Sequence, residues 1–213
     1  EIKESALAMT LSRLSKEGKI MRIAKGKYYK PELSRFGALR PKESAIIEAL
    51  TTQNGQRIGY LTGIPMYNKL GLTSQVSNTL EIATNKPLPS KEVQGYRVKY
   101  QKKTFPIKDQ DISLLQLLDA IKDIKDIPDS SPDQALPVVL KQIKSLTPQD
   151  QQRLAKLALN YNAATRAVLG AIFQKIGMNT MLDQLSKSLN KLTKYNIGVS
   201  ELVLPDKRNW NIT

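Results

Sequence analysis

Near the start of the chain, apolar residues recur at helical spacing and predict a helix over residues 4–17. Leu7, Leu11 and Leu14 form one stripe along this segment, and we expect that stripe to be buried. The opposite side carries small and polar residues, and Gly18 follows as a stop signal. The pattern therefore predicts an amphipathic helix with one side open to solvent.

Two short strands are predicted after this helix. Residues 19–23 form the first, residues 24–27 form a turn, and Tyr28 and Tyr29 begin the second, which ends at Pro31. A helix followed by a two-stranded hairpin with a basic tip is typical of the second half of a winged helix-turn-helix.

The middle of the chain mixes helices and strands. Residues 41–53 predict a helix, and residues 57–72 predict a short strand that leads into a helix beginning at Pro65. Residues 79–84 and 95–101 alternate between apolar and polar positions, as strands do.

Two details of this region bear on packing. The sequence GYLTG at 59–63 places two glycines four residues apart, which in this polar context indicates close backbone packing. In the last strand, Tyr96 and Tyr100 share the apolar face, while Arg97 and Lys99 share the other. We therefore expect the tyrosines in the core and not on a surface that stacks bases.

From residue 111 onward the apolar spacing is helical. Helices are expected over residues 112–126, from Ser131, from Thr147, from Asn162 to Ile176, and over residues 179–192. The chain is thus predicted to be an α+β protein that is mostly helical. Its expected parts are an incomplete winged-helix DNA-binding region at 1–40 and a second domain at 41–213, which is mixed α/β at 41–105 and helical at 106–213.

Composition limits the chemistry that this chain can perform. The 213 residues include no cysteine and no histidine, which excludes disulfides, thiol nucleophiles and the commonest general base. Asp119, Asp123 and Asp126 lie near one side of a predicted helix and could hold Mg²⁺, but interleaved lysines favour a solvated face. We expect no catalysis, no metal and no cofactor. No apolar run is long enough for a membrane span.

The charge indicates a polyanionic partner. Lys and Arg number 33 against 19 Asp and Glu, a net charge of +14. Residues 1–42 hold 11 of these cations and 4 of the acids, so +7 of the total lies in the first fifth of the chain. Nucleic acid is the first partner that such a distribution suggests.

The candidate DNA contacts lie on the first helix and hairpin. The small and polar side of the helix could approach base edges in the major groove, and the basic turn could follow the phosphate backbone. Arg22 either contacts phosphate or pairs with Glu17. The full set of candidates is Ser5, Met9, Ser12, Arg13, Lys16, Arg22, Lys25, Gly26 and Lys27.

The segment LSRLSKEGKIMRIAKGKYYKP at 11–31 resembles the winged-helix end of AbiEi-like antitoxins. These proteins belong to type IV toxin–antitoxin systems of bacteria, which act in abortive infection. The similarity continues through RIGYLTGIPMYNKLGL (57–72), NTLEIATNK (78–86), LLQLLDAIKDIKDIPD (114–129) and LTKYNIGVSELVLP (192–205). Many winged-helix regulators share the first motif, and its combination with the 57–86 block is more specific.

The resemblance implies a cytoplasmic antitoxin with a role in phage defence. In this family the winged helix binds operator DNA and represses its own operon, and the C-terminal domain counters a nucleotidyltransferase-like toxin encoded next door. The second helix of the motif and the wing read DNA, and their matching positions are the candidate contacts named above. In the family about two helices precede this one, and we find none here. We also expect a homodimer on paired half-sites.

Three alternatives remain open at this stage. The first is a plain winged-helix transcriptional regulator with no toxin partner. The second is an RNA-binding protein, suggested by the high pI and by Arg97 and Lys99. The third is a nucleotidyltransferase-type enzyme that acts through the Asp119 cluster.

Overall fold

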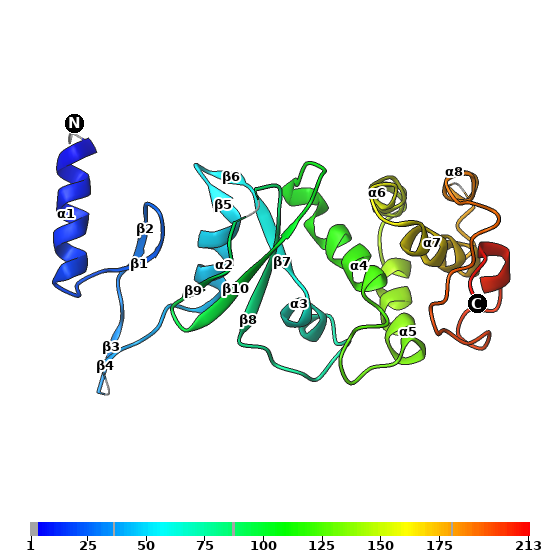
Figure 1. Cartoon of the computed structure of the whole chain (residues 1–213), viewed down its shortest axis with the longest axis horizontal. Coiled ribbons are helices and arrows are strands. Elements are labelled where there is room, and N and C mark those ends of the chain that lie inside the picture. The colour runs from blue at the N-terminus through cyan, green and yellow to red at the C-terminus, as the bar shows by residue number, and fades with distance from the viewer. Residues whose placement is uncertain (1–3, 36, 87, 180) are drawn as a thin grey trace.

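The N-terminal end of the molecule is a helix followed by two hairpins (Figure 1). In this computed structural model, residues 4–35, 37–86, 88–179 and 181–213 are described. Helix α1 (Glu4–Lys16) precedes the hairpin of β1 (Met21–Ala24) and β2 (Lys27–Tyr29), as predicted. A second hairpin, β3 (Leu33–Ser34) with β4 (Gly37–Ala38), was not predicted.

A four-stranded sheet forms the middle of the molecule. Its strands lie in the order β7 (Gly59–Thr62), β8 (Thr79–Thr84), β10 (Tyr96–Lys102) and β9 (Lys91–Val93). Strands β8 and β10 are parallel, and the two outer pairs are antiparallel. Strand β9 was not predicted. It covers only three residues at the edge of the sheet, which is too short for an alternation of apolar and polar positions to be recognised.

Short elements connect the hairpins to this sheet. Helix α2 (Glu43–Thr51) is followed by the small hairpin β5 (Thr52–Gln53) and β6 (Gln56–Arg57), and helix α3 (Ile64–Lys69) follows β7. The predicted close packing at 59–63 is present. A Cβ atom added to Gly59 would lie 2.5 Å from the carbonyl oxygen of Ala83, which is closer than real Cβ contacts allow.

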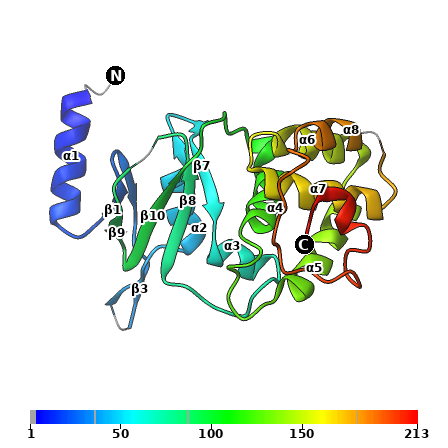
Figure 2. The same ribbon diagram turned by 45° about the vertical axis from the view of Figure 1, so that its right-hand side comes forward.

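Helices fill the far end of the molecule (Figure 2). They are α4 (Ile112–Lys122) after a 3₁₀ turn (Asp109–Asp111), α5 (Pro132–Lys144), α6 (Pro148–Ala158), α7 (Ala163–Lys175) and α8 (Leu182–Lys187), before a last 3₁₀ turn (Lys207–Trp210). The α+β fold class is therefore as predicted. Ser131, Thr147 and Asn162 each cap a helix through their side-chain oxygens, as the sequence indicates.

The last helix is shorter than predicted. Helix α8 covers six residues of the expected 179–192, because the chain then turns back across α7. Trp210 packs against Gly170 of α7, where any side chain would collide with the indole ring. Tertiary packing of the C-terminal tail thus replaces the extra helical turns that the apolar spacing suggests. Among the described residues, every helix is too short or too polar to cross a lipid bilayer.

The sheet separates two hydrophobic cores. The larger core lies between the sheet and helices α4 to α8, and Tyr60 and Ala83 enter it from β7 and β8. The smaller core lies on the other face, where Leu61, Ile82 and Val98 pack with helix α2. As predicted, Val98 is buried with Tyr96 and Tyr100 packed against the same core, while Arg97 and Lys99 are exposed.

The smaller core crosses the expected domain boundary after residue 40. Ile23 of strand β1 is buried in it, together with Ile46 and Leu50 of helix α2. The side-chain amide of Gln94, in the β9–β10 turn, also donates to the backbone oxygen of Arg22 at 3.2 Å. The β1–β2 hairpin therefore belongs to the sheet's core, and residues 41–213 alone would leave that core incomplete.

The apolar stripe of helix α1 is not buried as predicted. Leu7 is 47% exposed, and Leu11 and Leu14 are half-buried. Neither core includes a residue of α1, because this helix projects from the end of the molecule and does not lie on the sheet (Figures 1 and 2). Helical spacing predicts which residues share a side, but the tertiary structure decides whether that side is covered.

The prediction that Asp119 lies on a solvated helix face is wrong. Its exposure is 1%, whereas Asp123 is half-buried and Asp126 is exposed. The Asp119 carboxylate forms an ion pair with Lys103, which follows β10 and is 9% exposed. In the described part of the chain, no group of three acidic residues could hold a metal ion.

Three hydroxyl groups complete the environment of the Asp119 carboxylate. Tyr60 and Thr62 of β7 donate to its Oδ2 at 2.9 and 2.8 Å, and Tyr161, which follows α6, donates to its Oδ1 at 2.7 Å. The ammonium group of Lys103 lies 4.9 Å from the centre of the Tyr161 ring and 5.9 Å from that of Tyr60. We call these five residues the Asp119 network.

Burial and the Asp119 charge raise the pKa of Tyr60 and of Tyr161, so both phenols stay protonated and act as donors. Because four donors occupy the carboxylate, its charge is compensated inside the core. The Asp119 network therefore joins the sheet to the helices.

We predict that Asp119→Ala lowers the free energy of unfolding by about 3–5 kcal/mol, because Lys103 is left as an unpaired buried charge. Urea unfolding measures the change. The matched control is Asp126→Ala, an exposed aspartate close to the same helix, which should change stability by less than about 0.5 kcal/mol. Equal stability of the two variants would contradict a structural role for the network.

Candidate nucleic-acid interface

Helix α1 presents the predicted helix contacts along one side. Ser5, Met9, Ser12, Arg13 and Lys16 are all exposed, and the helical rotation places them on one side of the helix. The exposed fraction of the Arg13 side chain is 72%. A projecting helix with small, polar and basic side chains on one side has the form required to enter a major groove.

Glu17 directly follows this stripe in the sequence. Its carboxylate pairs with Lys19 at 2.8 Å and with Arg13 at 3.8 Å. The hydrogen bond from Lys19 holds the pKa of Glu17 below its usual value. Exposed pairs of this kind are weak, so a phosphate can displace Glu17 from Arg13.

Arg22 does not pair with Glu17, which was one of its two expected roles. Its Nε donates to the backbone oxygen of Ala24 at 3.2 Å, within its own strand. The side chain is exposed, so its guanidinium group is accessible from solvent.

The tip of the β1–β2 hairpin is a two-residue turn. Ala24 pairs with Lys27, which leaves Lys25 and Gly26 at the tip, both exposed. Gly26 has a φ of +72°, a backbone conformation that side chains rarely adopt, so glycine is required there. The predicted turn is therefore present, and Lys25 is exposed at its tip.

The side chain of Lys27 contacts helix α2 and does not extend from the hairpin tip as expected. Its Nζ donates to the carbonyl oxygen of Ala49 at 2.9 Å and also to that of Thr52, at the C-terminal end of helix α2. Burial lowers the pKa of Lys27, and the charge of Glu48 opposes this effect. A cation at a helix C-terminus satisfies carbonyl groups that lack partners in the helix. The structure thus uses Lys27 to attach the hairpin to α2, and not as a free phosphate ligand.

Sequence reasoning missed the second hairpin near this surface. Arg35 is exposed beside the turn between β3 and β4, and Lys30 is exposed just before β3. In Figure 1 this hairpin projects below the first hairpin. The glycine at position 37 was the one sequence signal for this turn, and its φ of +108° is a conformation that glycine favours. The hairpin was missed because strands of two residues show no alternation of apolar and polar positions.

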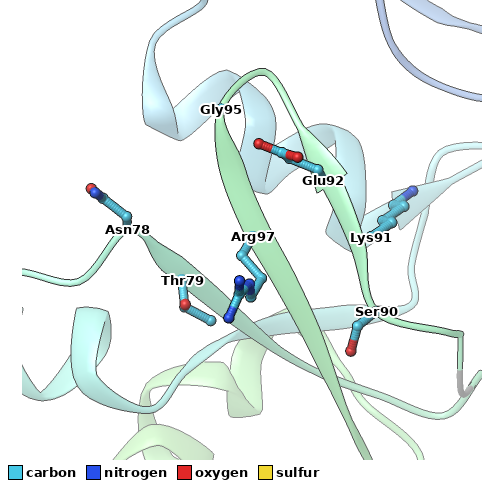
Figure 3. Close-up of a pocket in the computed structure, with 7 residues that line it drawn as sticks. All are labelled: Asn78, Thr79, Ser90, Lys91, Glu92, Gly95 and Arg97. Atoms are coloured by element: carbon cyan, nitrogen blue, oxygen red, sulfur yellow. The ribbon is translucent and has the colours of Figure 1, made fainter.

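A polar hollow of about 620 Å³ lies at the end of the sheet near the β9–β10 turn. Figure 3 shows Arg97 over β8 and β10, with Asn78, Thr79 and Ser90 around it, while Lys91 extends outward from β9. Glu92 lies opposite Arg97 in the strand register and also lines the hollow. The described residues of its lining include no aromatic side chain, whereas proteins commonly bind single-stranded RNA by stacking its bases on aromatic rings.

We predict that Lys27→Met destabilises the fold by about 1–2 kcal/mol, because two carbonyl groups lose a charged donor. Lys25→Met is the matched control, since it removes the same charge two residues away on the exposed tip. Thermal or urea unfolding should separate the two variants. If Lys27→Met leaves the stability unchanged, Lys27 does not hold the hairpin to helix α2 and is available to bind phosphate, as the sequence predicts.

The fold is similar to one solved structure in particular. The crystal structure of the Rv2827c protein from Mycobacterium tuberculosis aligns with a TM-score of 0.53 at 10% sequence identity. The alignment covers 88% of this chain and 71% of that one, and at this identity the likeness concerns the fold alone. No curated protein matches the chain significantly.

One family model matches most of the sequence, including helix α1, both N-terminal hairpins and the entire sheet. The match extends over residues 3–154 and ends within helix α6. The chain therefore belongs to DUF6088, a family of unknown function.

Proposed function

We propose that this protein is a non-enzymatic, DNA-binding antitoxin that represses its own operon through helix α1 and the β1–β2 hairpin. The observation that carries the DNA-binding part is the projecting, basic end of the molecule. Arg13, Lys16, Arg22 and Lys25 are exposed there, on a helix and a hairpin that lie next to each other in the chain. Cations on one projecting end can neutralise several phosphates together.

The roles of the contacts follow from their elements. Arg13 on α1 would reach base edges, where a guanidinium group can contact a guanine through two hydrogen bonds. Lys25 on the hairpin tip would contact phosphate and so add affinity without sequence preference. Lys27 is left out of this interface because its ammonium group is bound to helix α2.

The antitoxin part of the proposal rests on the resemblance of the sequence to AbiEi-like antitoxins. It assigns neutralisation of a nucleotidyltransferase-like toxin to the sheet and the C-terminal helices. An enzymatic role for this chain finds no support at Asp119, since its carboxylate oxygens are occupied by Lys103 and three hydroxyl groups. The neighbouring gene distinguishes this proposal from a plain regulator: an antitoxin is expected beside a gene for a nucleotidyltransferase-like toxin, and a plain regulator is not.

We predict salt-dependent binding to duplex DNA. Contacts from about four cations give a slope of log K against log salt of about −3.6, and Lys25→Ala should reduce its magnitude by about 0.9. Fluorescence anisotropy at several salt concentrations measures both values. Lys141→Ala, which removes an exposed charge from helix α5, is the control and should keep the slope of the wild type. A flat salt response, or preference for structured RNA in competition, would reject the proposal.

We also predict that DNA binding and toxin neutralisation can be separated by removing α1 alone. A fragment of residues 18–213 should fold, since neither core contains a residue of α1, and it should lose specific binding to the operator because Arg13 is removed. A fragment of residues 41–213 should be less stable, because it lacks Ile23 and Lys27.

Co-expression of each fragment with the neighbouring toxin, together with a gel shift on the promoter, tests this division. Growth rescue by residues 18–213 without a shifted promoter is the expected result. A folded 18–213 fragment that fails to rescue growth would show that neutralisation requires helix α1.

A further inference from the structure

A second hollow, of about 340 Å³, lies behind the tip of the β1–β2 hairpin. The hairpin contributes Ala24 and Lys25 to its lining, and the sheet contributes Tyr100. The segment between β8 and β9 contributes Lys86, and β9 contributes Lys91. The hollow is thus assembled from segments far apart in the sequence, and sequence analysis gave no sign of it.

The charged residues in the lining of this hollow are all lysines, set among apolar side chains such as Leu50, Ile58 and Leu88, and none of the described lining residues carries a carboxylate. Lys25, Lys86 and Lys91 are all exposed at it. Lys86 donates to the side-chain oxygen of Gln53 at 3.0 Å, a neutral partner that leaves its charge uncompensated. Three cations without a paired acid create a positive potential that favours an anion.

Neighbouring acidic groups do not cancel this potential. Glu48 of helix α2 acts electrostatically on Lys27, the remaining lysine of the lining. Its carboxylate is already bound by Arg57 at 2.9 Å and by the Thr52 hydroxyl at 2.6 Å. Lys25, Lys86 and Lys91 therefore keep their capacity to bind a ligand, whereas Lys27 is held by the carbonyl groups of helix α2.

Tyr100 also lines the hollow. Its hydroxyl is buried and finds no hydrogen-bond partner within the described part of the chain. Buried polar atoms are paired in most proteins, so an orphaned one needs an explanation. Burial also raises the pKa of Tyr100, so the phenol stays neutral and adds no negative charge beside the lysines.

We propose that this hollow binds a backbone phosphate of the DNA that flanks the site read by helix α1, through Lys86 and Lys91. The inference rests on the proposed function and extends its interface from the hairpin tip onto the sheet. Lys25 supports this continuity, because it stands at the tip of the wing and lines the hollow as well. A duplex held at Lys25 thus has further cations beside it, and DNA is favoured over a free phosphate ester for this reason.

The experiment compares the wild type with the double variant Lys86→Ala/Lys91→Ala. Binding of a fluorescent duplex is measured by anisotropy as a function of salt. The phosphate at the hollow adds to the four contacts at helix α1 and the hairpin, so the wild-type slope becomes about −4.5, and the double variant should reduce its magnitude by about 0.9 and weaken binding about tenfold at 0.1 M salt. Lys141→Ala/Lys144→Ala removes the same charge from exposed positions of helix α5 and should bind like the wild type. Circular dichroism melting verifies that both variants are folded.

Failure of this inference differs from failure of the proposed function. If the wild type binds duplex with the expected salt slope and the double variant keeps that slope and affinity, the phosphate site is overturned while the α1 and wing interface stands. If the wild type does not bind duplex, both fail. A third arm adds inorganic phosphate and a mononucleotide to each protein in thermal melts. Stabilisation of the wild type alone, without an effect of the double variant on duplex binding, would assign the hollow to a free ligand and overturn the DNA assignment.

Discussion

The ion pair between Lys103 and Asp119 is the interaction on which the arrangement of sheet and helices depends. Asp119 lies on helix α4, and its partners come from β7, from the end of β10 and from the segment after α6. A carboxylate in the core is costly unless each of its acceptor sites is used. The orientation of α4 on the sheet is therefore set by the directions in which the four donors point.

The candidate DNA interface lies on the other side of the sheet, where some residues attach the β1–β2 hairpin and others stay exposed. Ile23 anchors the β1–β2 hairpin in the smaller core, and Lys27 holds the hairpin to the end of helix α2. Lys25, two residues away, is exposed at the tip. Two lysines of one turn thus serve different purposes, because one meets carbonyl groups without helical partners and the other meets only solvent.

This attachment has a consequence for recognition. The hairpin is attached to the smaller core and to helix α2, so its tip has a defined position beside Lys86 and Lys91, and in the proposed interface these cations would act as one preorganised surface. Helix α1 is less constrained, since its residues belong to neither core. The two parts of the proposed interface therefore differ in rigidity. The hairpin and sheet provide a fixed basic platform, and the helix that would read bases projects from it.

The sequence by itself determined the elements whose cause is local. Helical spacing, the caps at Ser131, Thr147 and Asn162, and strand alternation at 79–84 and 95–101 depend on neighbours in the chain and are present in the structure. The short strands and hairpins of the N-terminal half went unpredicted in part, because two or three residues carry no periodic signal.

The tertiary structure decided which charged and apolar side chains are buried and which partners they contact. Asp119 and Asp126 look alike in the sequence, yet only the first meets a buried lysine that stands sixteen positions away. Lys25 and Lys27 are equivalent in a turn until helix α2 is placed behind one of them. Leu7, Leu11 and Leu14 lie on a helix, as their spacing predicts, but no other element of the fold buries them. Burial and pairing are relations between distant segments, so a local pattern can propose such partners but only the folded chain brings them together.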